Sequence, residues 1–180
     1  MNKLSKSLVL AGLGALILAG CIVTGTFVIT KKVDDFTAST SGLFDAAFVD
    51  VTQEEIWQDH KDDIKYISDV RFRGTIRNTS SNLAAGQIYF SYTGTYTTPA
   101  EVREASDAGD AFVVFSGFTI QPQGQYFLSF AESSQYRQNL DEALKLLESG
   151  QFYMYALTPE DVFSLQVTKA YVMLVLDAGK

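Results

Sequence analysis

Arg71, Arg73 and Arg77 are three of the five arginines in this chain of 180 residues. They alternate with apolar residues over 70–77, and this period of two predicts a β-strand that presents all three guanidinium groups on one face. Like charges about 7 Å apart along a strand repel one another unless negative groups compensate them. The stripe is therefore a candidate surface for an anion or an acidic partner, such as lipid phosphates or another protein. The alternative, which we favour, is that the protein's own carboxylates pair with these arginines.

Few residues of this chain are suited to catalysis. His60, the single histidine, belongs to a type that transfers protons or binds metals, but its position one helical turn after Trp57 favours packing beside that indole. Zinc prefers several His or Cys ligands, and the chain has one residue of each type. We therefore predict no catalytic residue, no metal site and no cofactor, and we expect a protein that is not an enzyme.

Acidic residues cluster around this histidine in the sequence. Calcium-binding loops place carboxylates at alternate positions and bend at a glycine, and this segment contains no glycine. We interpret the carboxylates as a solvated helix face. The cluster consists of Glu54, Glu55, Asp59, Asp62 and Asp63.

The N-terminal segment has the layout of a secretory signal. Lys3 and Lys6 form a basic start, and an uncharged, largely apolar stretch follows over 8–19. Cys21, the sole cysteine of the chain, comes directly after two small residues at the end of this stretch. A single cysteine also excludes an internal disulfide framework.

Leu18, Ala19, Gly20 and Cys21 resemble the lipobox of bacterial lipoproteins. In that motif the small residues give a peptidase access to the backbone, and the cysteine thiol accepts a diacylglyceryl group. The resemblance implies cleavage before Cys21 and a thioether-linked lipid on it, with N-acylation of the new terminus in many bacteria. At about 0.8 kcal/mol per buried CH₂, two or more acyl chains anchor a protein stably to a membrane.

A second interpretation of the same segment is an uncleaved membrane anchor. Residues 7–30 carry no charge, and a membrane-spanning helix needs only about 20 residues. Against this, 22–30 is rich in β-branched residues, which favour a strand. We favour the lipoprotein, with a signal peptide over 1–20 and a single domain over 21–180.

The lipobox resemblance also carries an implication for location. In Gram-negative lipoproteins an Asp after the lipidated cysteine commonly signals retention at the inner membrane, and this chain has Ile22 there. The resemblance thus implies a lipid-anchored protein of the cell envelope, on the periplasmic face of the outer membrane if the cell is Gram-negative. Because apolar residues begin at Ile22, we expect the domain to start within about five residues of the lipid and to lie close to the bilayer.

Composition and charge limit the possible partners. The chain has 14 basic and 21 acidic residues, a formal net charge of −7. Without residues 1–20 it has 12 basic residues against 21 acidic ones, a net charge of −9. This acidity argues against nucleic acid as a partner, because phosphate binding needs clustered positive charge. An apolar share of 47% predicts a folded domain.

Periodicity predicts seven or eight strands and two helices, largely in hairpin order. The helices are expected over 52–64, opened by a Thr52–Glu55 capping box, and over 135–149. Thr/Ser/Gly residues over 37–42 predict a turn, and 99–110 is a polar segment in which we expect no more than a helical turn. The expected strands cover 24–33, 43–51, 70–77, 87–96, 111–120, 125–130, 152–157 and 163–176.

Short links between successive strands favour antiparallel pairing over the alternating strand–helix order of a parallel sheet. We therefore predict a mainly β fold, an antiparallel β-sandwich with two accessory α-helices. Residues 74–94 are loosely similar to immunoglobulin-like domains of bacterial surface proteins, in which a strand ending in Asn-Thr-Ser leads through a turn to a second apolar strand. We expect most aromatic residues, including Tyr153 and Tyr155, to fill the core rather than to form an exposed tyrosine face.

Two classes of function remain open from the sequence. The first is a membrane-anchored lipoprotein of the cell envelope with a non-enzymatic binding or assembly role, held by the lipid on Cys21 and associated with another envelope protein. The alternative is an enzyme or small-ligand carrier whose polar site is scattered over strands and loops. An exposed arginine or aromatic patch would favour the first class, and a deep pocket with convergent carboxylates would favour the second.

Overall fold

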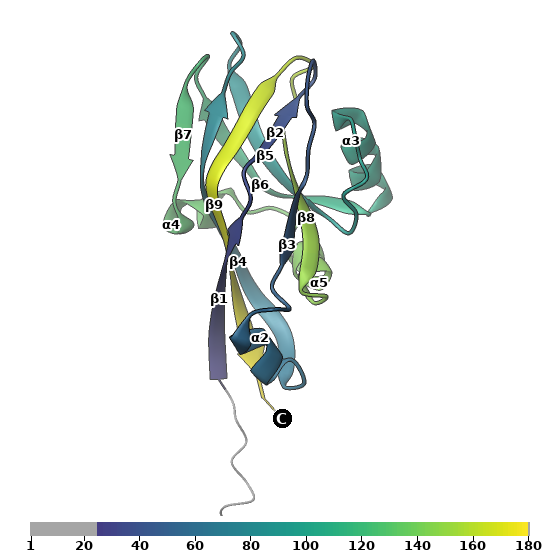
Figure 1. Ribbon diagram of the computed structural model, residues 1–180, viewed down its shortest axis with the longest axis vertical. Helices are drawn as coiled ribbons and strands as arrows, with labels where there is room; N and C mark the ends of the chain where they lie inside the picture. Colours follow the sequence, from purple (N-terminus) through teal and green to yellow (C-terminus); the bar gives the residue numbers. More distant parts are fainter. Residues whose placement is uncertain (1–24, 180) are drawn as a thin grey trace, which may run out of the picture.

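The structure is a computed structural model that describes residues 25–179, and its architecture is a sandwich of two antiparallel β-sheets (Figure 1). In the first sheet β9 lies between β4 and the pair β1 and β2, and β7 extends the far edge beside β4. The strands of this sheet are β1 (Gly25–Val33), β2 (Phe36–Ser39), β4 (Ile64–Asn78), β7 (Gln125–Leu128) and β9 (Ser164–Ala178). The strand β2 overlaps the turn predicted over 37–42. A strand forms there because Phe36 and Ala38, two positions apart, both point inward and are buried.

The second sheet has the order β3-β8-β5-β6, and every pair in it is antiparallel. Its outer strands are β3 and β6, and the chain crosses between the two sheets after β6, after β7 and after β8. The strands are β3 (Ala47–Asp50), β5 (Ala84–Ser91), β6 (Ala111–Ile120) and β8 (Gln151–Leu157).

Aromatic rings fill the space between the two sheets. Phe72 of β4 lies 6.0 Å from Phe115 of β6, measured between ring centroids, and Phe90 of β5 lies 4.7 Å from Phe152 of β8. All four rings are buried. In β4 the buried residues around Phe72 alternate with outward-facing ones, so that one face of the first sheet lies in the core. The predicted mainly β, antiparallel sandwich is confirmed.

The sequence patterns predict two helices, whereas residues 25–179 contain four, with a short 3₁₀ turn after the third of them. The predicted capping box at Thr52 is wrong, because the Thr52 hydroxyl and amide both donate to the Asp50 carboxylate, at 2.6 and 2.8 Å, and the helix starts three residues later. The helix expected over 135–149 is shorter than predicted, because Asn139 has a left-handed backbone and the helix begins only at Leu140. The helices are α2 (Glu55–His60), α3 (Pro99–Ala108), α4 (Phe130–Ser133) and α5 (Leu140–Leu147).

A buried asparagine organises the crossing from β4 to β5. The Asn78 amide donates to the carbonyls of Asn82, Ile120 and Gln121, and its own carbonyl accepts from the amide and hydroxyl of Ser80. These bonds turn the chain out of the first sheet and into the second. The strand–turn–strand pattern expected over 74–94 is therefore present.

The start of β1 and the end of β9 lie at the same end of the sandwich, because Gly25 pairs with Ala178. Figure 1 shows α2 at this end as well, beside the start of β4. We call it the terminal end. The lipobox residues Leu18, Ala19, Gly20 and Cys21 lie outside the described residues. No helix within 25–179 is long and apolar enough to cross a membrane.

Candidate functional site

The three arginines of the predicted stripe lie on the outer face of β4. Arg73 and Arg77 are exposed and Arg71 is half-buried, whereas Phe72 and Ile76 between them are in the core. A register irregularity between residues 73 and 75 does not interrupt this alternation. The structure therefore brings the three arginines to one face, and it shows a different environment for each.

Arg71 is compensated by the protein's own acid. Its Nε lies 2.9 Å from the Asp69 carboxylate, two residues earlier on the same strand. Arg137, which follows the 3₁₀ turn after α4, forms an ion pair with the other oxygen of the same carboxylate. Asp69 is thus shared by two arginines and leaves a net positive charge at this end of the stripe.

Arg73 packs between two aromatic rings instead. Its guanidinium carbon lies 5.7 Å from the ring centroid of Phe127 on β7 and 5.8 Å from that of Tyr171 on β9. Phe127 is itself 52% exposed. Cation–π contacts hold the guanidinium in place without neutralising it, so its charge remains available at the surface.

Arg77 has neither arrangement. It is exposed, and its neighbours across the ladders are Gln125 and Gln166. Within residues 25–179 no carboxylate lies within ion-pairing distance of it. Pairing with the protein's own acids, the alternative favoured from the sequence, therefore accounts for Arg71 alone.

Lys32 completes a row of cations and aromatic rings across the first sheet. It pairs with Tyr171, which in turn pairs with Arg73, and it is exposed. We define the basic face as the outer surface of the first sheet formed by this row and its neighbours. Its members are Lys32, Arg71, Arg73, Arg77, Phe127 and Tyr171.

His60 lies on the inner side of α2 and is half-buried. Its imidazole stacks on the Phe27 ring, with centroids 4.0 Å apart and planes inclined by 20°. The ring contact expected with Trp57 is thus made with Phe27, a residue of β1. In the part of the chain that the structure describes, no group of three His, Cys, Asp or Glu side chains is arranged to hold a metal ion.

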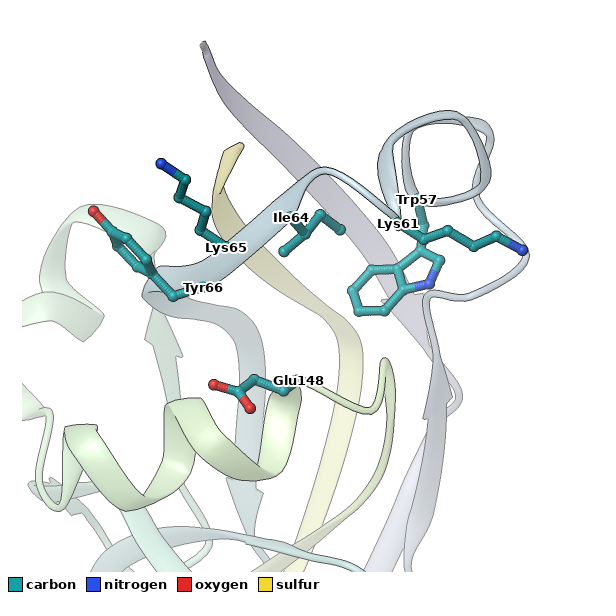
Figure 2. Close-up of a pocket in the computed structure, with 6 residues that line it drawn as sticks. All are labelled: Trp57, Lys61, Ile64, Lys65, Tyr66 and Glu148. Carbon is teal, nitrogen blue, oxygen red and sulfur yellow. The ribbon is translucent and has the colours of Figure 1, made fainter. Parts of the chain in front are cut away.

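A small pocket of about 150 Å³ lies beside Trp57 at the terminal end. Figure 2 shows it between the indole, Ile64 at the start of β4 and Glu148 at the end of α5. The ammonium groups of Lys61 and Lys65 point to opposite sides, away from the hollow (Figure 2). The two ammonium groups do not converge on a common point, and the pocket is therefore not arranged to bind an anion.

A much larger groove, of about 610 Å³, opens at the edge of the sandwich where β1 turns into β2. Residues from three separate segments line it: the β1–β2 turn, the chain leading into β3 and the loop after β5. Carboxylates and aromatic rings predominate, and no lysine or arginine of the described chain lines it. We define the acidic groove by Asp34, Asp35, Phe44, Asp45, Phe48 and Tyr96.

Tyr155 lies beneath the acidic groove and packs against two of its aromatic rings, Phe44 and Tyr96. It is fully buried, its hydroxyl donates to the Thr93 carbonyl at 3.1 Å, and it accepts the Tyr96 amide at 3.3 Å. Its ring stacks on Phe44, with centroids 5.8 Å apart. Burial raises the pKa of Tyr155 to about 12, which keeps the hydroxyl neutral and able to donate.

The sequence pattern predicts the basic stripe but not the acidic groove. A period of two along one strand identifies the arginines, whereas the groove residues come from turns and loops up to 63 positions apart. The one available signal was Asp34-Asp35, a pair of acids that follows Lys31 and Lys32 between two segments without charge.

No family model and no curated protein matches this chain. Among solved structures, a chain described as Desmodium yellow mottle tymovirus is similar over 87% of this chain and 90% of its own length, with 11% identity and a TM-score of 0.26. A likeness of this size bears on neither fold nor function.

Proposed function

We propose that this protein is a lipid-anchored lipoprotein of the bacterial cell envelope, with a non-enzymatic binding or assembly role. Its basic face is the docking surface for an acidic protein. The observation that carries the binding role is the exposure of Arg73 and Arg77 without carboxylate partners, on a protein whose net charge is −7.

The proposed anchor is the lipid on Cys21. This residue precedes Gly25, the first residue of β1, by four positions. A chain of four residues spans at most about 14 Å, so the terminal end of the sandwich is held near the bilayer. Such a tether restricts the domain to partners in or beside the same membrane.

The composition of the basic face favours a protein partner over a lipid surface. Arginine, tyrosine and phenylalanine are enriched at the centres of protein–protein interfaces, and Phe127 and Tyr171 flank Arg73. The acidic cluster in and beside α2 lies at the terminal end, and its carboxylates repel anionic lipid headgroups. An acidic protein complements the charge of the basic face and buries its rings.

The anchor is tested by replacing Cys21 with Ser in the full-length protein. We expect loss of incorporated radioactive fatty acid and accumulation of the uncleaved precursor, because the serine hydroxyl does not accept the diacylglyceryl group. A Cys21→Ser protein that stays membrane-bound at unchanged mass would instead support the uncleaved anchor over 7–30.

The binding role is tested in the full-length protein, purified from its own membrane after mild cross-linking. Arg73→Gln with Arg77→Gln removes the two uncompensated charges, and we expect at least a tenfold loss of an acidic partner that 0.5 M salt also releases. Lys61→Gln with Lys65→Gln is the matched control, because it removes two exposed charges at the terminal end. Equal recovery of the partner by both double variants would refute the proposal.

A further inference from the structure

We infer that the acidic partner is a second copy of this chain, whose acidic groove receives the basic face of its neighbour. This inference rests on the proposed function and deepens it, because it names the partner. It joins two surfaces of the same protein that have opposite charge and matching aromatic content.

The charges of the two surfaces are complementary. Asp34, Asp35 and Asp45 are exposed along the acidic groove, and the described residues that line it include no cation. Opposite it, Arg73 and Arg77 carry charges that the protein does not neutralise itself. Complementary potentials of this kind set the register of an interface and accelerate association.

The aromatic rings of the acidic groove can bind guanidinium groups, as its carboxylates can. Phe44, Phe48 and Tyr96 line the groove, and Phe48 is 47% exposed. A guanidinium group stacks on aromatic faces and pairs with carboxylates in a planar fork. The free guanidinium of Arg77 meets both kinds of group in the groove, and the volume of about 610 Å³ leaves room for more than one side chain.

The pairing of the strands places Asp34 of the acidic groove at nearly the same distance from the terminal end as Arg73 of the basic face. Lys32, Tyr171 and Arg73 lie in one row across the first sheet, and Asp34 follows two residues after Lys32. Lys32 is seven residues from Gly25, which is about 24 Å along a strand. Copies anchored through Cys21 in one membrane therefore present Arg73 and Asp34 at nearly the same height.

The end of the basic face that carries Arg77 and Phe127 lies on the other side of β9 from the acidic groove, whereas Lys32 lies on β1 near the groove. Phe127 of the basic face is on β7, the far edge strand, whereas the acidic groove borders β1 and β2 on the other side of β9. Arg77 of one copy therefore cannot enter the acidic groove of the same copy. A contact between two different surfaces is heterologous and joins one copy to the next, so the expected assembly is a row or a closed ring of copies in the membrane.

The test uses cysteine cross-linking of the full-length, membrane-anchored protein. Thr75→Cys places a thiol between the arginines of the basic face, and Thr97→Cys places one at the rim of the acidic groove. Neither change alters a charge. Combined in one chain and oxidised, they should give a ladder of dimers, trimers and higher species.

The matched control pairs Thr75→Cys with Gln138→Cys, an exposed position outside both surfaces. A ladder from the first pair at least five times stronger than from the control supports the inference, provided that Arg73→Gln with Arg77→Gln abolishes it. A ladder no stronger than the control overturns the inference. So does a ladder that persists when Asp34, Asp35 and Asp45 are changed to Asn.

Other occupants of the groove give distinct results. A rise in melting temperature with arginine ethyl ester, in the absence of a ladder, assigns the groove to a small organic cation and overturns the inference. If the ladder is absent while the arginine double variant still loses an acidic partner of different mass, the proposed function stands and only the self-association fails. If the same membranes show no fatty-acid label at Cys21, the proposed anchoring fails.

Discussion

The guanidinium carbon of Arg73 lies 5.8 Å from the centroid of the Tyr171 ring, which faces it directly across the β4–β9 ladder. Phe127 covers the other side at 5.7 Å. Such contacts are worth about 0.5–1 kcal/mol at exposed sites. Their main effect is to hold one charged group in a single position before a partner arrives, which lowers the entropy cost of binding.

Asp69 forms ion pairs with two arginines at one end of the basic face, and removing its charge should lower the stability of the fold measurably. We expect Asp69→Asn to lower the free energy of unfolding by about 1 kcal/mol, because Arg71 and Arg137 then face each other without a counter-charge. Urea unfolding followed by the fluorescence of Trp57, the single tryptophan, measures it. The loss should shrink in 1 M salt, and Asp62→Asn, at an exposed position, should leave stability unchanged. Equal values for the two variants would contradict this role of Asp69.

The buried Asn78 amide should be among the most sensitive polar groups of the fold. Its donor lies 2.6 Å from the Asn82 carbonyl and 3.3 Å from those of Ile120 and Gln121. We expect Asn78→Ala to cost about 2–3 kcal/mol, because these buried carbonyls lose their partner. Thermal unfolding should show the loss for Asn78→Ala, and Asn82→Ala, which keeps the backbone acceptor, should behave like the wild type.

Gly86 is required because the Phe118 ring lies against its backbone. A Cβ at position 86 would lie 2.0 Å from Cε2 of that ring, closer than any real contact. We expect Gly86→Ala to lower the free energy of unfolding by about 1–3 kcal/mol, the usual cost of overpacking a core. Gly42→Ala is the control, because its nearest neighbour would be at an ordinary 3.7 Å. A Gly86→Ala protein as stable as the control would show that the ring moves aside freely.

Alkaline stability should depend on Tyr155. Burial raises the pKa of Tyr155 to about 12, against about 10 in the unfolded chain. The neutral hydroxyl therefore stabilises the fold fully below pH 10, and this contribution is lost as the pH rises toward 12, because the unfolded chain ionises first. By pH 11 the wild type should lose about 1 kcal/mol through this group alone.

Tyr155→Phe isolates this effect. The variant should be less stable than the wild type at pH 8, because two hydrogen bonds are lost, and its stability should fall less steeply between pH 9 and pH 11. The hydrogen bond with Tyr136 raises the pKa of Tyr126 to about 12 as well, but Tyr126 is present in both proteins and cancels in the comparison. Parallel decline of the two proteins would exclude Tyr155 as the group responsible.

The strands were easier to predict than the helices. The apolar run over 111–120 predicts β6 with the bounds that it has, because a buried strand between turn residues leaves a clear pattern. The helix α3 was predicted as no more than a helical turn, although Thr98 caps it, Pro99 opens it and Gly109 ends it in a left-handed conformation. Only Val102 and Ala105 of this helix are buried, which is too few apolar positions for a helical period to stand out.

The sequence by itself determined the strand periodicity, the shared face of Arg71, Arg73 and Arg77, and the lipobox resemblance that ends at Cys21. These properties depend on neighbours along the chain, where a period of two or a run of four residues is sufficient. Only the tertiary structure decided which groups contact each arginine, because Tyr171, which contacts Arg73, comes from a strand almost one hundred residues away. It also decided the acidic groove, since three loops with no common pattern meet there only after the two sheets have packed.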